Sequence, residues 1–412
     1  MGLKVAHFSD LHYSPDRLKE ADSCFTSAVT AAICLGVDCA IITGDSTDHA
    51  MDAHSPAVKA LADQIRHLSN HCPVLMLQGT FSHEPPGFLK LLSMVAGKFP
   101  VSVADGIGQW MLTGNAFKPY NNFEIPRLVV SAMPTLNKAH IAALVENVAD
   151  EASIGTRAVV SNVIREWGAM HDQMREKGIP SVVISHGTVF NSVTEHGVPM
   201  AGVDHELGID TLFDSRADAI MLGHIHKHQS WDRQLLTSKG VTNQVIAYAG
   251  SIGRFHFGEE CEKGWLLWDI DAETGAQFTM TPTPSRRNVE FVFDGPPDMN
   301  ELTVRRSECD GAYVRVRYAV DEEHWHRIDR AEIKRILSNA AEVKIEGERL
   351  VIQRQRAAGI SKVSMAEKLV MWANHTQTPN PKALQERLEM IQADQAETVA
   401  QKIIAGLVPA SV

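Results

Sequence analysis

Residues 217–226, ADAIMLGHIH, run from an apolar segment directly into a Gly-His-x-His motif. A short apolar run that ends at a glycine is typical of a buried β-strand, and we predict a strand over 217–222. His224 and His226 follow at once, so the loop after this strand carries two imidazoles spaced two residues apart. Residues at i and i+2 of such a loop can point to the same side, which allows the two histidines to serve one polar site.

Four other short polar motifs occur along the chain, most of them directly after a predicted strand. They are Asp10 and His12 in SDLH, Gly44 and Asp45 in TGD, residues 79–84 in GTFSHE, and His186 in VVISHG. Loops at the carboxyl ends of the strands of an α/β sheet converge on one edge, so residues far apart in sequence can meet there. Each motif alone would occur by chance in many chains, but the ordered set predicts one site.

The first 280 residues alternate short β-rich runs with longer amphipathic stretches, which is typical of an α/β layered domain. Strands are predicted over 3–8, 39–43, 74–77, 128–132, 181–185, 217–222 and 245–249, and further strands over 264–270 and 277–281 close a second sheet. Helices are predicted over 18–35, 56–68, 88–96 and 159–175. Beyond residue 287 we predict strands over 312–318 and 349–354, a helix over 328–338, and a long helix that starts at Pro381 and includes Val399 and Ile403.

The residue types in these motifs suit a pair of divalent metal ions. Imidazole and carboxylate together favour Mn²⁺, iron or Zn²⁺, and the absence of cysteine from every motif argues against a structural zinc site. A single carboxylate, Asp45, can bridge two ions about 3.5–4 Å apart, the spacing that two-metal sites use to clamp the attacking and leaving oxygens of a phosphate ester.

Composition excludes several classes of protein. The chain has 412 residues, 44% hydrophobic and 22% charged, which rules out a disordered or fibrous protein. No run of about 18 apolar residues is present, so we expect no membrane span and a cytoplasmic protein. Six scattered cysteines without a CxxC pair indicate neither a disulfide framework nor a zinc ribbon. The net charge of −11 argues against coating of nucleic acid by bulk positive charge.

The motifs DxH, GD, a GNHE-like GTFSHE, a separate histidine and GHxH resemble those of the calcineurin-like metallophosphoesterases. Residues 223–229, GHIHKHQ, and 248–251, YAGS, are most similar to the SbcD type of DNA-repair exonuclease subunit. The resemblance implies a four-layer α/β sandwich of two mixed sheets flanked by helices, followed by a small α+β accessory domain and C-terminal helices. It implies a nuclease domain over 1–283, an accessory capping domain over 284–362, and a helical partner-binding segment over 363–412.

Carried over by position, the resemblance implies two divalent ions, with manganese as the expected metal. One ion would be held by Asp10, His12, Asp45 and His226, and the other by Asp45, His186 and His224. His83 would protonate the leaving oxygen or stabilise the phosphoryl group. The asparagine of the family motif is absent, so a hydroxyl replaces it, either Ser82 or, if two residues are inserted, Thr80.

The favoured function is hydrolysis of phosphodiester bonds in DNA, in a complex with an SbcC-type coiled-coil ATPase. The alternatives are a phosphatase or cyclic-nucleotide phosphodiesterase acting on a small substrate, and a scaffold subunit with an impaired metal site. Arg305, Arg306, Arg315 and Arg317 could contact DNA phosphates, or they could be solvated charges on a strand edge. The C-terminal helices could dock on the ATPase or pack on the chain itself, and the resemblance implies a homodimer.

Overall fold

A computed structural model describes residues 2–52, 54–135, 152–193, 207–350 and 363–407. The chain divides into two compact units. The larger contains Met1–Phe293, Pro297–Tyr318 and Asp329–Glu346, and the smaller contains Asp294–Pro296, Ala319–Ile328 and Gly347–Val412. Residues of the expected accessory domain therefore fall in both units.

The larger unit is built on one continuous hydrogen-bonded path of strands, in the order β4-β3-β2-β1-β12-β13-β11-β9-β8-β7-β5-β6, with β10 paired to β11. The strands are β1 (Leu3–Phe8), β2 (Cys39–Ile42), β3 (Val74–Leu77), β4 (Val101–Ala104), β5 (Gly108–Thr113), β6 (Ala116–Pro119), β7 (Leu128–Met133), β8 (Ser181–His186), β9 (Ala219–Gly223), β10 (Gln229–Thr237), β11 (Gly240–Tyr248), β12 (Gly264–Asp271) and β13 (Gly275–Pro282). The α/β class is as predicted.

We expected two mixed sheets, and the strands instead form one path with two halves. Its two halves join where β11 meets β13, through the single residue pair Asn243 and Gly275. Gly275 has φ +85°, and a Cβ atom there would lie 2.1 Å from the Asn243 carbonyl oxygen, so only glycine permits this approach. Side chains of both halves share one core, because Val5 and Ile41 of one half belong to the same buried cluster as Val130 and Met221 of the other.

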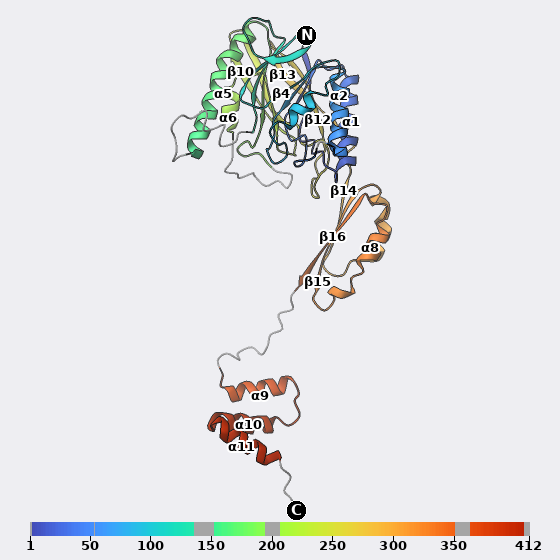
Figure 1. Cartoon of the computed structure of the whole chain (residues 1–412), viewed down its shortest axis with the longest axis vertical. Helices are drawn as coiled ribbons and strands as arrows, with labels where there is room; N and C mark the ends of the chain where they lie inside the picture. Colours follow the sequence, from blue (N-terminus) through green and yellow to red (C-terminus); the bar gives the residue numbers. More distant parts are fainter. Residues whose placement is uncertain (1, 53, 136–151, 194–206, 351–362, 408–412) are drawn as a thin grey trace, which may run out of the picture. The chain divides into compact units, whose positions relative to one another are not determined.

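Helices cover the outer faces of the two halves. Figure 1 shows α1 (Leu18–Cys34) and α2 (Pro56–Ser69) on one side of the strands and α5 (Ala152–Glu176) and α6 (Ile209–Asp214) on the other. α2 begins as capping rules predict: the Ser55 hydroxyl accepts a hydrogen bond from the backbone N–H of Ala57, and Pro56 takes the first helical position. The short α3 (Phe88–Ser93) follows the GTFSHE motif.

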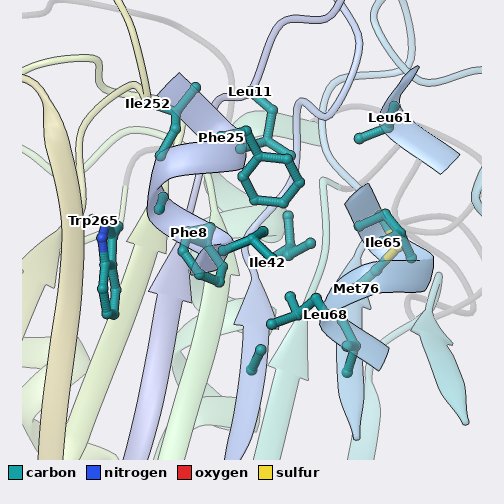
Figure 2. Close-up of a cluster of buried hydrophobic side chains, with 14 of the residues drawn as sticks. Phe8, Leu11, Phe25, Ile42, Leu61, Ile65, Leu68, Met76, Ile252 and Trp265 are labelled. Atoms are coloured by element: carbon teal, nitrogen blue, oxygen red, sulfur yellow. The ribbon is translucent and has the colours of Figure 1, made fainter. Parts of the chain in front are cut away.

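The core beneath α1 and α2 is apolar and closely packed (Figure 2). Phe8 of β1 contacts the Phe25 ring of α1 edge to face, with ring centroids 5.4 Å apart, and Trp265 of β12 lies 5.3 Å from Phe8 on another side. Leu61 and Ile65 of α2 are fully buried in the same cluster. This core fixes the ends of β1, β2 and β3, from which three of the predicted motifs emerge.

After β13 the chain forms a small sheet of order β14-β15-β16, with β14 (Asn288–Phe293) parallel to β15 (Tyr313–Asp321), and β16 (Glu342–Leu350) at the edge. The helical segments here are α7 (Met299–Val304), η1 (Arg305–Cys309), η2 (Trp325–Arg327) and α8 (Arg330–Ile336). Most of the strand predicted over 349–354 lies outside the described residues.

The smaller unit contains α9 (Met365–His375), α10 (Pro381–Ala393) and α11 (Ala396–Leu407). The single long helix predicted from Pro381 is wrong, because Asp394 takes an extended conformation and ends α10. Aspartate competes with the helix backbone for hydrogen bonds, which explains a break there. No described helix combines the length and the apolar character that a bilayer span requires.

Candidate metal centre

The motifs predicted to share one edge do meet. β1 is parallel to β2, and β2 is parallel to β3, so Asp10, Asp45 and Thr80 all follow the carboxyl ends of neighbouring strands. The other half of the strand path contributes β8 and β9, which pair in parallel with His186 opposite Gly223. Backbone contacts join the loops: the N–H of Asp10 donates to Gly44 O at 3.1 Å, and the N–H of His224 donates to Asp10 Oδ2 at 3.0 Å.

Four residues of the site have backbones in the left-handed region, which is rare for residues other than glycine. The φ angles are 50° at Asp10, 44° at His12, 51° at Asp45 and 101° at His224. Strained backbone of this kind persists only where the surrounding structure enforces it, and it concentrates at functional sites. All four residues belong to clusters with metal-ligand spacing.

The first ligand group contains Asp10, His12 and His226, whose nitrogen and oxygen donors all lie within 4.8 Å of one another. Nε2 of His12 lies 2.9 Å from Nε2 of His226 and 3.8 Å from Oδ1 of Asp10. Asp10 is fully buried, and the Ser9 hydroxyl donates to its Oδ2 at 2.6 Å. Two imidazole nitrogens and a carboxylate therefore converge on one point, as a divalent ion requires.

The second ligand group contains Asp45, His186 and His224, again with donors within 4.8 Å. Nε2 of His186 lies 3.2 Å from Oδ2 of Asp45. Asp45 also belongs to a third group with His12 and His83, so its carboxylate stands between the first and second groups.

Thr80 and Ser82 are the two candidates for the hydroxyl that replaces the asparagine of the family motif. The hydroxyl of Thr80 lies beside the second ligand group. Thr80 Oγ1 donates to Asp45 Oδ2 at 3.2 Å and lies 3.3 Å from His186 Nε2. The Thr80 N–H also donates to Asp45 Oδ1 at 2.7 Å. Ser82 is exposed in the turn that follows.

His83 belongs to the third group, and its side chain is 30% exposed. Its Nδ1 is 2.8 Å from Oδ2 of Asp45, and the hydrogen bond to that carboxylate raises the pKa of His83 against the opposing effect of burial. The Thr47 hydroxyl donates to the His83 carbonyl and holds the loop. A charged His83 that donates through Nδ1 keeps a second proton on Nε2, the form that a general acid needs.

Burial and neighbouring charges shift the pKa values of Asp45, His186 and His224 in different directions. Burial alone would raise the pKa of Asp45, but the charge of His186 and hydrogen bonds from His186 and His83 hold it well below its usual range. Burial alone would lower the pKa of His186, yet the charge of Asp45 raises it to about 10. Burial, together with the charge of His186, lowers the pKa of His224 to about 4.

The buried carboxylate of Asp45 favours a positive charge beside it, which is why the pKa of His186 is raised. A divalent ion bound there would supply that charge in place of the proton. Two buried carboxylates and four imidazoles with converging donors therefore fit a pair of divalent ions.

Sequence reasoning did not single out three acidic residues that support the site. Glu259 Oε1 lies 2.9 Å from Nδ1 of His226, and Asp48 Oδ1 lies 3.4 Å from Nδ1 of His12. Glu84, within the predicted GTFSHE motif, accepts from the N–H groups of Ser46 at 2.5 Å and Gly79 at 2.7 Å and so ties two motifs together. Burial, reinforced by the charge of Asp45, raises the pKa of Glu84 to about 7.

The four arginines proposed for DNA contact lie in or beside the small sheet, and three of them pair with glutamates. Arg305 pairs with Glu301 and Glu308. Arg315 pairs with Glu346 at 2.7 Å, and Arg317 lies 3.7 Å from Glu290. Arg306 donates to the Ser338 hydroxyl.

Comparison with known proteins gives little beyond this geometry. No protein-family model matches the sequence, and no curated protein matches it. Among solved structures, the chain is similar to a dimetal phosphatase from Danio rerio at 10% identity, with a TM-score of 0.39, over 68% of this chain and 98% of that chain. Any function assigned to this chain therefore depends on the residues of the three ligand groups.

Proposed function

We propose that the chain is a two-metal phosphoesterase whose substrate is a phosphodiester, with DNA as the favoured substrate. The observation that carries the proposal is the position of Asp45, which lies within 3.2 Å of His186 on one side and shares a ligand group with His12 and His83 on the other. The converging Asp and His ligands are those of the calcineurin-like pattern, which supports membership of that superfamily. Its four-layer arrangement is proposed for the two halves of the strand path, which share a core and join through one residue pair.

Two divalent ions at these groups would act as Lewis acids that neutralise phosphate charge and activate a water molecule for attack. Asp10, His12, His226 and Asp45 would hold one ion. Asp45, His186, His224 and the Thr80 hydroxyl would hold the other. The backbone N–H of His224 orients Asp10, and that of Thr80 orients Asp45, so both carboxylates are fixed before substrate arrives.

His83 completes the reaction at the leaving group. As water attacks phosphorus and the ester P–O bond breaks, the proton on Nε2 of His83 passes to the departing oxygen. Asp45 orients the ring through Nδ1 and stabilises its charged form. General acid catalysis of this kind contributes about 10²–10⁴-fold in rate.

A phosphatase or cyclic-nucleotide phosphodiesterase acting on a small substrate is the second candidate. It is favoured by the ion pairs of Arg305, Arg315 and Arg317, because arginines already neutralised by glutamates attract a DNA backbone less strongly. A scaffold with one impaired ion site is the third candidate, and metal analysis distinguishes it by finding fewer than two ions per chain.

Incubation of the protein with Mn²⁺, Mg²⁺ or Zn²⁺ and three substrates tests the proposal. The substrates are linear double-stranded DNA, a chromogenic phosphodiester and a chromogenic phosphomonoester. Metal-dependent cleavage of DNA that is lost in Asp45→Ala supports the nuclease, and cleavage of only the small esters supports the second candidate. No hydrolysis with any metal, or hydrolysis that survives Asp45→Ala, contradicts a phosphoesterase at this site.

The helices of the smaller unit are proposed to bind an SbcC-type coiled-coil ATPase. Trp372 is 50% exposed, Ile391 is 62% exposed and Ile404 is 63% exposed, so these helices present apolar side chains. A chain that ends at residue 362 should keep its metal site and lose ATPase binding. Aggregation of the truncated chain would instead indicate that the helices pack on the chain itself. The homodimer also remains a proposal, tested by the mass of the protein in solution.

A further inference from the structure

The histidines of the two ligand groups differ in the groups that lie next to their Nδ1 atoms. Nδ1 of His226 is 2.9 Å from Oε1 of Glu259, and Nδ1 of His12 is 3.4 Å from Oδ1 of Asp48. In the second group, Nδ1 of His186 is 2.7 Å from the carbonyl oxygen of Thr43, which is a neutral peptide group. Among the residues that the structure describes, the His224 ring makes no hydrogen bond to a carboxylate.

A carboxylate behind a metal-binding histidine has two effects. It fixes the tautomer and the ring orientation, so that the other nitrogen faces the ion, and it makes that nitrogen a stronger ligand. Both effects match His226, whose Nδ1 contacts Glu259 and whose Nε2 lies 2.9 Å from Nε2 of His12. His12 has only the charge of Asp48 near its Nδ1, at 3.4 Å. His83 has the opposite orientation, with its Nδ1 towards Asp45.

Glu259 is held in place for this role. Its Oε2 accepts from the Phe255 N–H at 3.0 Å and lies 3.3 Å from Nζ of Lys263, while the side chain is 3% exposed. His226, His256 and Glu259 also form a group with metal-ligand spacing. The ammonium group of Lys263 beside Glu259 already provides the positive charge that an ion there would supply, so Glu259 serves His226 rather than an additional ion.

Asp48 is held less tightly. Its side chain is 39% exposed, and its other oxygen lies 3.6 Å from Nδ1 of His49. The Asp48 N–H donates to the Tyr13 carbonyl at 3.1 Å, which keeps the residue beside the loop that carries His12. Nδ1 of His12 makes no hydrogen bond among the described residues, so Asp48 acts on it through charge alone, at 3.4 Å, and its effect should be smaller than that of Glu259.

We infer that Glu259 and Asp48 are positioning residues that make the group of Asp10, His12 and His226 the tighter of two unequal divalent-ion sites. The inference rests on the metal binding of the proposed function and adds an order to it: the first group fills before the group of Asp45, His186 and His224. Neither residue contacts the ion, and each acts through a histidine.

Calorimetric titration of the metal-free full-length protein with Mn²⁺ tests the inference, followed by Co²⁺ titration monitored by its visible absorption. The wild-type chain should show two binding steps of unequal affinity. Glu259→Gln, which keeps the size of the side chain and removes its charge, should weaken the tighter step about 10–100-fold. Asp48→Asn should weaken the same step by less. The weaker step should remain, which shows that the fold is intact.

Matched controls lie beside each residue. Glu260→Gln and Asp52→Asn remove exposed acids near the same loops and should leave both steps unchanged. His12→Ala should abolish the tighter step, and His224→Ala should affect chiefly the weaker one. Two steps of equal affinity, or a tighter step unchanged in both Glu259→Gln and Asp48→Asn, would overturn the inference and leave the proposed function standing. A wild-type chain that binds no divalent ion would overturn both.

Discussion

Oδ2 of Asp45 lies 2.8 Å from Nδ1 of His83, so the carboxylate shared by the ligand groups also orients this partly exposed imidazole. The same oxygen lies 3.2 Å from Nε2 of His186. Under the proposed function, Asp45 would bind the ions and also orient the proton donor, and mutation can separate these two roles.

Replacing His83 by Ala should leave both ions bound and lower the turnover number by about 10²–10⁴-fold, because only the proton donor is lost. Asp45→Ala should remove metal binding and activity together. Metal content measured beside steady-state rates separates the two results. A fully active His83→Ala protein would contradict the role given to this residue.

Replacing Thr80 by Val should weaken the binding of the second ion by about tenfold, the lower end of the range for lost supporting contacts at metal sites. Valine matches threonine in shape and lacks the oxygen that lies 3.3 Å from His186 Nε2. Ser82→Ala is the control, because Ser82 is exposed and should be neutral. The reverse pattern in an Mn²⁺ titration would assign the hydroxyl ligand to Ser82.

Replacing Gly44 by Ala should destabilise the protein by about 1–3 kcal/mol, the range for overpacking, and weaken ion binding. Gly44 has φ +94°, and a Cβ atom there would lie 2.4 Å from Nδ1 of His186 and 2.7 Å from Cα of Gly79. Gly106→Ala is the control, since no atom lies within 4 Å of its added carbon. Denaturant melts with and without Mn²⁺ measure both effects, and a Gly44→Ala protein as stable as Gly106→Ala would refute the crowding described.

The free energy of unfolding should fall as the pH drops from about 6.5 towards 4, in part because of His171. Burial lowers the pKa of His171 to about 4, and its ring contacts the Ser215 carbonyl at 2.7 Å and the Ser131 hydroxyl at 2.9 Å. Because the unfolded chain binds this proton more readily, the contribution of His171 to the free energy of unfolding is fully present above pH 6.5. It is lost as the pH falls from 6.5 to 4, by up to about 1.4 kcal/mol per pH unit. His171→Asn should flatten that slope in urea melts across the range, and an unchanged slope would contradict the assignment.

Much of the site was predictable because parallel strands place their following residues at one edge. β1 and β3 have the predicted bounds, and Asp10, His12, Asp45, His186, His224 and His226 all lie in the ligand groups. The supporting acids were not predictable. Glu259 is 33 residues from His226 in an irregular loop, so neither periodicity nor spacing connects them.

Some elements of the fold were not predicted because apolar and polar residues are mixed in their sequences. β5 and β6 form an antiparallel hairpin whose strands carry polar residues such as Gln109 and Lys118, so no apolar run marks them. The single path of strands also could not be foreseen, because one glycine at position 275 joins its halves. The break between α10 and α11 falls at Asp394, within a pattern of apolar residues that otherwise indicates one helix.

The most direct test of the central claim is anomalous scattering from a crystal of the full-length protein grown with excess manganese. Two peaks are predicted, one against Asp10, His12 and His226 and one against His186 and His224, with Asp45 touching both. A map with no peak beside Asp45, or one that places these side chains too far apart to share an ion, would contradict the account.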